Sequence, residues 1–294
     1  MVDISVVIPC RNAAPTLGRQ LDALLAQESP AEFEIVVADN GSTDGTVALA
    51  HSYADPRIRV VDAGRRPGVN VGRNVGVEAS RGRFILLTDG DDIVHDGWLE
   101  AHYRAFAGGA DAVGGGLDRI LEDGTILVKS RQLFPSLYRR NLFANGTNCG
   151  FTREAFDRIG GFDEEFMGGA DEVDFYWRLA DAGYRLTFVE GAVVSKVQHA
   201  EPHNAFTQHL NYGKGEARLI GKFRPSYLRV VVACVSLQSF IWGLAWAAGI
   251  ARRRTLRIFA FNLGLLSESA RLIAMRPPRQ RLARLVQRIF LPRD

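Results

Sequence analysis

Three aspartates follow a short apolar run and could share one ligand. The run extends from Phe84 to Thr88, and Asp89, Asp91 and Asp92 come directly after it. A continuous apolar run of this kind is typical of a strand buried on both faces. Asp89 and Asp91 would point the same way at its carboxyl end, and their repulsion favours a shared Mg²⁺ or Mn²⁺ that also binds substrate phosphates. A polar turn is the alternative, because Asp and Gly are common turn formers.

Other charged residues occur where they could bind a nucleotide or its phosphates. Asp39 ends a second apolar run and could accept a hydrogen bond from a base or a ribose, although a turn role is favoured when this segment is taken alone. Arg73 lies in a Gly-rich segment that is not a P-loop, and its planar guanidinium could bind a phosphate. Asp171, Glu172 and Asp174 begin a predicted helix, where carboxylates also compensate the helix dipole.

The elements that would position these residues alternate between strands and helices. In the first half we predict strands at 4–9, 34–39, 57–61 and 84–88, a helix capped by Thr16 and running to about Gln27, a helix opening at 42–46, a glycine-rich loop at 64–72 and a helix at 73–80. In the second half we predict helices at 98–106, 153–159 and 171–182, and strands at 112–116, 126–129, 184–189 and 193–199. This rhythm predicts an α/β fold with a mostly parallel sheet flanked by helices.

The composition is that of an ordinary folded protein, but its charge is unevenly distributed. The chain has 294 residues, of which 47% are hydrophobic and 23% charged. Residues 222–294 hold 14 Lys and Arg against 2 Asp and Glu, which predicts an anionic partner for this region, either nucleic acid or a lipid surface. Three cysteines without metal spacing predict reduced thiols in a cytosolic setting, and no signal peptide is expected.

The carboxyl-terminal region has the patterns of membrane contact. Residues 230–251 carry no charge and meet the length criterion for a membrane-spanning helix. Residues 276–293 form an Arg-rich pattern with apolar residues on one side, as in helices that lie on anionic membranes. We therefore expect membrane association and no nucleic-acid partner. A buried helical hairpin is the alternative.

Five motifs in register resemble the family 2 glycosyltransferases with a GT-A fold. They are Ser5-Val6-Val7-Ile8-Pro9, Asp39-Asn40-Gly41-Ser42-Thr43-Asp44, Gly72-Arg73-Asn74, Asp89-Gly90-Asp91-Asp92, and Gly160-Gly161-Phe162-Asp163-Glu164 followed by the segment 171–179. The resemblance covers about residues 3–200. It implies a catalytic domain at 1–222 with a Rossmann-like sheet. The charge and hydropathy patterns described above predict a helical, basic, membrane-associated region at 223–294.

The resemblance also implies roles for individual residues. A nucleotide-diphosphate sugar would be the donor, and its binding residues would be Pro9, Arg11, Asp39, Arg73, Asp89, Gly90 and Asn148. Asp91 would bind the divalent metal, Mn²⁺ or Mg²⁺. His199 could also approach the metal, although a structural role is an alternative. The family has its base as the Asp of a Glu-Asp-x-Asp motif, whereas this chain has Asp171-Glu172-Val173-Asp174, so Glu172 is favoured as the base over Asp171.

These implications define an inverting glycosyltransferase. It would move a sugar from its nucleotide donor to an acceptor hydroxyl. The patterns of the carboxyl-terminal region favour cell-surface glycan or glycolipid synthesis at the cytoplasmic face of the membrane. A nucleotidyltransferase is one alternative, although Arg11-Asn12-Ala13 matches its expected Gly-rich loop poorly. A sugar-nucleotide-binding protein that has lost catalysis is another, and the carboxylate order at 171–172 is its only support.

Overall fold

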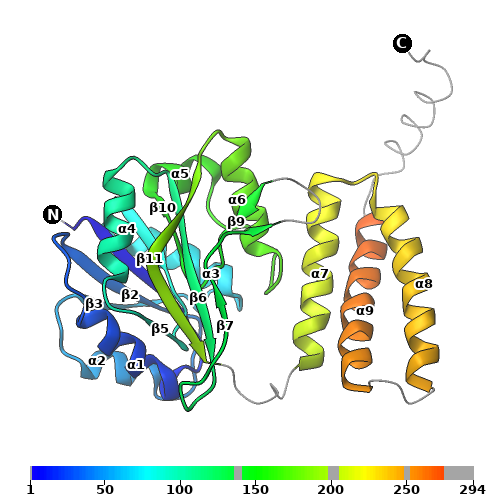
Figure 1. Ribbon diagram of the computed structural model, residues 1–294, viewed down its shortest axis with the longest axis horizontal. Coiled ribbons are helices and arrows are strands. Elements are labelled where there is room, and N and C mark those ends of the chain that lie inside the picture. The colour runs from blue at the N-terminus through cyan, green and yellow to red at the C-terminus, as the bar shows by residue number, and fades with distance from the viewer. Residues whose placement is uncertain (1, 136–140, 198–204, 248–251, 275–294) are drawn as a thin grey trace, which may run out of the picture. The chain divides into compact units, whose positions relative to one another are not determined.

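The computed structural model describes residues 2–135, 141–197, 205–247 and 252–274. The chain forms two compact units (Figure 1). The first contains residues 1–167 and 171–201, and the second contains 168–170 and 202–294.

The first unit is built on a mixed, mostly parallel sheet. Its amino-terminal strands are β1 (Ile4–Cys10), β2 (Phe33–Asp39), β3 (Ile58–Asp62) and β4 (Phe84–Leu87). The later strands are β5 (Asp92–Val94), β6 (Ala112–Ile120), β7 (Ile126–Ser130), β10 (Cys149–Thr152) and β11 (Leu186–Val197). The order is β3-β2-β1-β4-β10-β6-β11-β5, with β7 paired to β6, and a separate pair joins β8 (Phe134–Pro135) to β9 (Leu142–Phe143). The predicted α/β class and mostly parallel sheet are confirmed.

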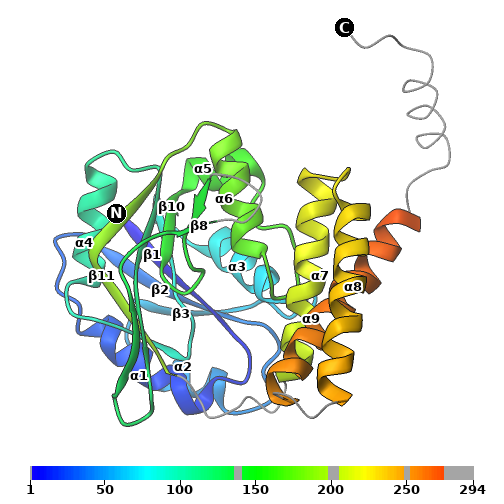
Figure 2. The same ribbon diagram turned by 45° about the vertical axis from the view of Figure 1, so that its right-hand side comes forward.

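Helices cover both faces of this sheet (Figure 2). They are α1 (Ala14–Leu25), α2 (Thr46–Ser52), α3 (Val69–Ala79), α4 (Trp98–Ala107), α5 (Arg153–Ile159) and α6 (Asp171–Asp181). Alternate residues of β1 divide between two cores, since Val6 and Ile8 pack with α1 and α4 while Val7 packs with α3, α5 and α6. The strands are therefore buried on both faces, as their continuous apolar runs predict.

Parallel pairing aligns the carboxyl ends of neighbouring strands at one edge. β1 pairs in parallel with β2 and with β4, and β2 pairs in parallel with β3. Asp39 therefore lies beside Cys10, and the segment after Leu87 emerges at the same edge. Ligands of open α/β sheets bind at this edge, so the fold places the predicted acidic residues where a ligand can reach them.

Several predicted boundaries differ from the observed ones, three of them as follows. Thr16 does not cap α1, because the helix starts at Ala14 and the Ala14 amide donates instead to Asp44 of the neighbouring loop, at 3.1 Å. Helix α3 starts at Val69, so Arg73 lies within the helix and not at its first residue. The two strands predicted at 184–189 and 193–199 are one strand, β11, with an irregular register between Val189 and Val193.

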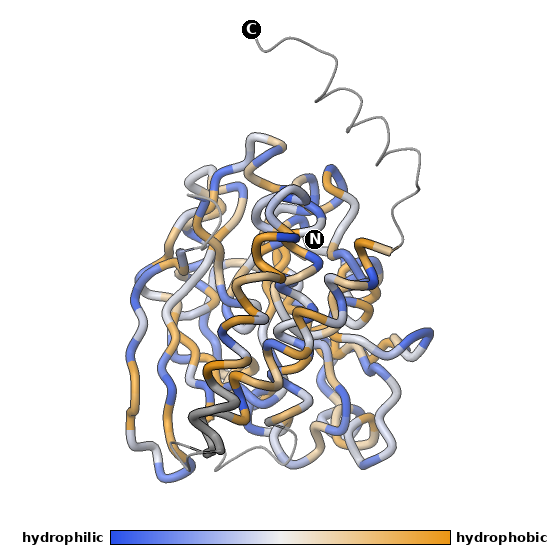
Figure 3. The backbone as a smooth tube through the Cα atoms, turned by 90° about the vertical axis from the view of Figure 1, so that its right-hand side faces the viewer, coloured by the Kyte–Doolittle hydropathy of each residue, from blue (hydrophilic) through white to orange (hydrophobic). Residues whose placement is uncertain are grey.

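The second unit contains α7 (Ala205–Phe223), α8 (Leu228–Ala247) and α9 (Arg252–Ala274). Helices α7 and α9 approach closely, since a Cβ at Gly213 or at Gly264 would collide with backbone atoms of the other helix. Arg218 pairs across them with the buried Glu268 at 3.0 Å. Hydrophobic residues run along the helices that face the viewer in Figure 3. Within the described part of the chain, each helix is too short or too polar to cross a membrane.

Candidate active site

The structure brings the three aspartates after β4 together. One carboxylate oxygen from each of Asp89, Asp91 and Asp92 lies within 4.8 Å of the others. Asp91 is the most exposed, with 45% of its side chain accessible, whereas the Asp92 side chain is fully buried. Neither Asp92 oxygen accepts a hydrogen bond. We call these three residues the acidic cluster.

Lys196 of β11 extends into the acidic cluster. Strands β5 and β11 are antiparallel and place Lys196 directly opposite Asp92. Its Nζ lies 3.3 Å from Asp89 Oδ2, 3.4 Å from Asp92 Oδ1 and 3.9 Å from Asp91 Oδ1. Burial lowers the pKa of Lys196, but the charges of Asp89, Asp92 and Asp91 outweigh it and raise the pKa above its usual value. Burial and the charge of Asp89 raise the pKa of Asp92 well above its usual value.

The acidic cluster suits a hard divalent cation. Its donors are carboxylate oxygens, the ligands that Mg²⁺ and Mn²⁺ prefer. The two Asp92 oxygens are buried without hydrogen-bond donors, and groups in that condition need a cation or another donor nearby. Asp91 and Asp89 remain partly exposed, so a ligand can approach from outside. The residues present therefore fit such an ion.

A second group of charges joins α3 to the start of α6. Arg73, which is 3% exposed, donates from Nη1 to Asp171 and to Asn70 Oδ1, the latter at 3.0 Å. Its Nη2 lies 3.5 Å from Glu172 Oε1. Asp171 is buried, whereas a quarter of the Glu172 side chain is exposed. Glu172 is therefore the member of this group that a substrate can reach.

The environment of Glu172 changes its acidity. Burial and the neighbouring Asp171 raise the pKa of Glu172 to about 7, although the charge of Arg73 acts in the opposite direction. Burial lowers the pKa of Arg73, but Asp171, Glu172 and Asp89 together raise it above its usual value.

Gly146 leaves room for the contact between Arg73 and Glu172. A Cβ at this position would collide with Arg73 Nη2 and with Glu172 Oε1. A larger residue would therefore push the ion pair apart. Gly146 lies three residues before β10, so the segment that leads into this strand meets helices α3 and α6 at the candidate base.

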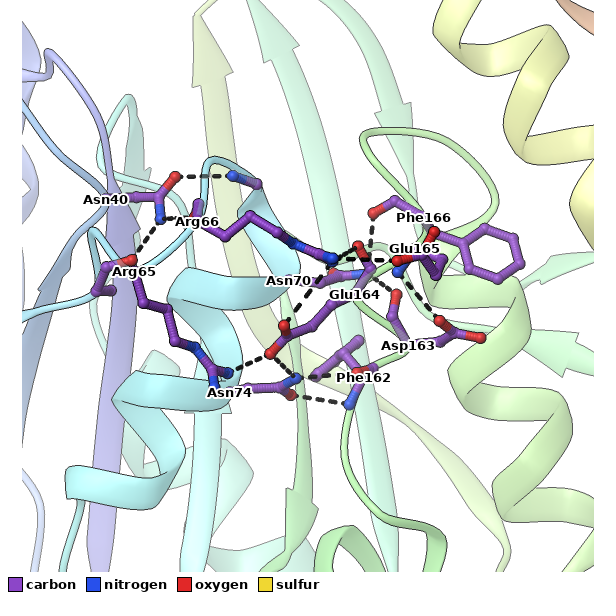
Figure 4. A network of polar contacts seen from close by, with 12 residues as sticks. Asn40, Arg65, Arg66, Asn70, Asn74, Phe162, Asp163, Glu164, Glu165 and Phe166 are labelled. Atoms are coloured by element: carbon purple, nitrogen blue, oxygen red, sulfur yellow. Dashed lines mark hydrogen bonds and ion pairs between the residues drawn. The ribbon is translucent and has the colours of Figure 1, made fainter. Parts of the chain in front are cut away.

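A polar network holds the loop before α3 in place (Figure 4). Asn40, at the end of β2, donates from Nδ2 to the carbonyls of Ala63 and Arg66, and its Oδ1 accepts from the Gly68 amide at 2.8 Å. The same loop forms ion pairs with the segment before α6, from Arg65 and Arg66 to Glu164 and Glu165.

Two asparagines of α3 continue this network toward α6. Asn70 Nδ2 donates to the carbonyls of Asp163 and Phe166, at 2.9 and 3.3 Å. Asn74 exchanges two hydrogen bonds with the Phe162 backbone, each 2.9 Å long (Figure 4). Since Asn70 also accepts from Arg73, the backbone that leads into α6 is tied to the same helix as the arginine.

The other predicted donor residues lie on the loops at this edge of the sheet. Asp39 ends β2, is 9% exposed and accepts from the Ser42 amide at 3.2 Å, so it also shapes a turn. Arg11 follows β1 and is exposed. Pro9 lies under α3, where a Cβ at Gly72 would approach its Cβ to 3.0 Å. Gly90 is similarly confined, since a Cβ there would lie 2.9 Å from Cys10 Sγ.

Asn148 lies inside the fold, whereas contact with a donor sugar would need an accessible side chain. It is fully buried, and its Oδ1 accepts from Trp98 Nε1 at 2.8 Å and lies 3.0 Å from His102 Nε2. Its Nδ2 donates to the Gly116 and Ala192 carbonyls. The amide is thus fully engaged within the fold, which favours a structural role over contact with a sugar. His199 lies outside the described residues.

Sequence reasoning did not identify Lys196, Gly146 and Asn70 as parts of the site. Lys196 comes directly after the short run Ala192-Val193-Val194-Ser195 and before Val197, and a charge in this position was the available signal. Gly146 and Asn70 carry no comparable signal, because glycine and asparagine are frequent in loops and turns.

Family models match most of the first unit. A model described as glycosyl transferase family 2 matches residues 5–160. A second, described as the N-terminal domain of galactosyltransferase, matches residues 130–204. Both matches include residues of the site described above.

Curated relatives with similar sequences include archaeal and bacterial proteins. Glycosyltransferase AglE of Haloferax volcanii is 30% identical over 238 residues, which are 77% of this chain and 77% of that protein. The succinoglycan biosynthesis protein ExoO of Rhizobium meliloti is 35% identical over 227 residues, 68% of this chain and 65% of that protein. ExoA of the same organism is 27% identical over 83% of this chain and 79% of its own length.

Solved structures share the fold. The mannosyltransferase PcManGT from Pyrobaculum calidifontis, in complex with GDP-Man and Mn²⁺, has a TM-score of 0.58 and 20% identity, over 99% of this chain and 81% of that one. TarS 1-349 from S. aureus, in complex with UDP-GlcNAc, has a TM-score of 0.57 and 16% identity, over 92% of each chain. The predicted GT-A fold is confirmed. With a family model matching residues 5–160 and a glycosyltransferase 30% identical over 77% of its length, this chain belongs to glycosyl transferase family 2.

Proposed function

We propose that this glycosyltransferase is inverting, uses a divalent cation and a nucleotide-diphosphate sugar, and acts in the synthesis of a surface polysaccharide or glycolipid. The relatives named for succinoglycan biosynthesis support the pathway class. The similar structures that hold GDP-Man with Mn²⁺ or UDP-GlcNAc support the donor class and the cation.

One observation carries the proposal. The segment that leads into β10 connects the acidic cluster with the α6 carboxylates. Cys149 is paired with Leu87, two residues before Asp89, and a Cβ at Gly146 would collide with Glu172 Oε1. Sugar transfer needs a cation near the leaving diphosphate and a base near the acceptor, and this arrangement provides a place for both.

Glu172 is the better base of the two neighbouring carboxylates. It is partly exposed and its pKa is raised to about 7, which lets it hold a proton and release it near neutral pH. Asp171 is buried and hydrogen-bonded to Arg73, so it acts as a positioning residue. In the reaction, Glu172 takes the proton of the acceptor hydroxyl and the acceptor oxygen bonds to the anomeric carbon. The bond from that carbon to the diphosphate breaks, and the diphosphate leaves with the electron pair.

Asp91 and Asp89 are the residues that would hold the cation, with Asp92 behind them. When bound, the ion supplies positive charge to the departing diphosphate. Asp39, Pro9, Arg11 and Gly90 would bind the nucleotide at the carboxyl ends of β1, β2 and β4. Arg73 is too deeply buried to approach the diphosphate in this arrangement, so we assign it the role of orienting Glu172 and Asp171.

The second unit would bring the enzyme to an anionic membrane surface, at the cytoplasmic face, where a lipid-linked acceptor is available. Large apolar residues of α8 are exposed, among them Leu237 and Phe240. The Arg residues that surround this helix in the sequence would meet anionic headgroups.

A panel of nucleotide sugars tests the function. Purified enzyme is incubated with each donor, Mn²⁺ and lipid-linked acceptors, and the anomeric configuration of the product is determined by NMR. We expect transfer from at least one donor with inversion at the anomeric carbon, and loss of transfer in Asp91→Ala and Glu172→Gln with folding retained. Retention of configuration, or full activity in both variants, would refute the mechanism.

A further inference from the structure

We propose that Lys196 is a positioning residue with two effects on the acidic cluster. Its ammonium holds the three carboxylates together in the metal-free enzyme, and it competes with the divalent cation for them. This proposal rests on the metal site proposed above. The Lys196 ammonium is then an internal cation that an incoming divalent ion must displace.

The ammonium already has the contacts of a shared cation. Its distances of 3.3, 3.4 and 3.9 Å reach all three members of a cluster whose own ligand atoms lie within 4.8 Å of one another. The register of β5 and β11 places the Lys196 backbone directly opposite Asp92. Opposite charges facing each other across two strands stabilise the pair.

The metal-free cluster requires such a cation. The Asp92 side chain is fully buried, and its oxygens have no hydrogen-bond donor. A buried carboxylate without a counter-charge is strongly destabilising, and two further carboxylates nearby increase the repulsion. In the described part of the chain, the ion pairs of all three aspartates are with Lys196. Lys196 therefore neutralises part of the negative charge of the acidic cluster when no metal is bound.

The same contacts make Lys196 a competitor. A divalent cation must take carboxylate oxygens that the ammonium now contacts, and two cations cannot share that space. The Lys196 side chain is 33% exposed and has a flexible four-carbon stem, so it can move aside. The buried ion pair of Arg73 with Asp171 differs, because each of its side chains is at most 5% exposed. Metal binding should thus displace Lys196 and leave Arg73 in place.

Mn²⁺ titration without nucleotide tests the proposal. Free Mn²⁺ is measured by electron paramagnetic resonance for the wild type, Lys196→Gln, Lys196→Arg and the control Arg104→Gln. Arg104 forms an exposed surface ion pair with Glu100, so its variant loses the same charge away from the cluster. We expect Lys196→Gln to bind Mn²⁺ ~10-fold more tightly or better, since a like charge is removed from the edge of the site. Lys196→Arg and Arg104→Gln should bind no more tightly than the wild type.

Thermal unfolding tests the other effect, the stabilisation of the three carboxylates in the metal-free enzyme. Without metal, Lys196→Gln should melt below the wild type, and saturating Mn²⁺ should raise its melting temperature by more than it raises that of the wild type. Unchanged or weaker Mn²⁺ binding by Lys196→Gln would overturn the proposal. If neither the wild type nor any variant binds Mn²⁺, the metal site of the proposed function fails instead, and the two failures are thereby distinguished.

The wild-type enzyme provides a test that does not depend on a variant folding. The Lys196 ammonium should give a protected NMR signal in metal-free enzyme, assigned by its absence in Lys196→Arg or, if that variant fails to fold, by its coupling to β11. Addition of diamagnetic Mg²⁺ should shift or abolish this signal in step with Mg²⁺ binding. A signal that stays unchanged at saturation would contradict displacement.

Discussion

At the scale of single residues, the proposed base Glu172 should make the activity depend on pH. Since its pKa is raised to about 7 and the base must be deprotonated, kcat/KM should rise with pH through about 7 and then level off. Glu172→Gln should lack this rise and lose about 10²- to 10⁴-fold in kcat, the usual contribution of a general base. Initial rates between pH 5.5 and 8.5, which brackets the raised pKa by about 1.5 units each way, measure both effects.

Unfolding measurements provide an independent check on the same group. A carboxyl whose pKa is higher in the folded state adds stability at low pH, and this is lost as the pH rises through about 7. The stability of the wild type relative to Glu172→Gln should therefore decrease over that range. A flat difference, together with an unchanged pH–rate profile in the variant, would exclude Glu172 as the titrating base.

The sequence identified the acidic residues of the site but not their partners. Asp89 and Asp91 follow a continuous apolar run, so local pattern indicated them. Glu172 was indicated by the family resemblance, because carboxylates in a first helical turn are also explained by the helix dipole. Lys196 approaches them through the pairing of β11 with β5, and these strands are far apart in sequence. Arg73 was expected at a diphosphate, and its burial beside Asp171 likewise depends on long-range packing.

At the scale of elements, a substitution at Gly146 tests the packing of the segment before β10 against α3 and α6. Gly146→Ala should separate Arg73 from Glu172, because the added Cβ would collide with both side chains. Overpacking of this kind costs about 1–3 kcal/mol of stability. We expect a folded enzyme with a lower melting temperature and a reduced kcat, measured by calorimetry and initial rates.

Gly191→Ala is the matched control, since Gly191 is exposed and a Cβ there would meet only Ala101 at 3.4 Å. It should resemble the wild type in both measurements. Equal effects of the two substitutions, or wild-type activity of Gly146→Ala, would show that the geometry around Glu172 tolerates displacement and that the proposed positioning by Arg73 is wrong.

The elements themselves were predictable where a single signal dominates. The short helix Arg153–Ile159 was predicted with its observed bounds, since Thr152 caps it through a side-chain bond to the Ala155 amide. Helix α1 was misplaced because its first amide is capped by Asp44, from a loop 30 residues away. The start of α3 was missed because Gly68, at φ +148°, and its contact with Asn40 set the helix start before Arg73.

At the scale of the whole molecule, the second unit should attach the enzyme to an anionic surface. The full chain should sediment with vesicles rich in phosphatidylglycerol and remain free with neutral vesicles, and salt should weaken the binding. Serine at both Leu237 and Phe240, which are exposed on α8, should weaken it further. Co-sedimentation over a salt series measures these effects.

The matched control replaces two exposed apolar residues of the first unit, Ile126 and Val128 on β7, with serine. This variant should bind vesicles like the wild type. Equal loss in both variants would show that general hydrophobicity is responsible, and binding to neutral vesicles alone would contradict the electrostatic part of the proposal.

The order of the sheet was less predictable than its class. The alternation of strands and helices predicted the parallel half, in which β1, β2 and β3 are neighbours in space as in sequence and β4 pairs with β1. The other half places β10 between β4 and β6, and β5 beside β11, through antiparallel pairs between distant segments. Those pairs depend on side-chain packing across the completed core, which no local window of sequence contains.

The central claim is that a cation held by the acidic cluster links the enzyme to the diphosphate of its donor. The most direct measurement is calorimetric titration with UDP and with GDP, with and without Mn²⁺, for the wild type and Asp91→Asn. We predict that Mn²⁺ tightens binding of at least one nucleotide to the wild type by about tenfold or more and has no such effect in Asp91→Asn. Equal affinity with and without Mn²⁺ in the wild type would contradict the account.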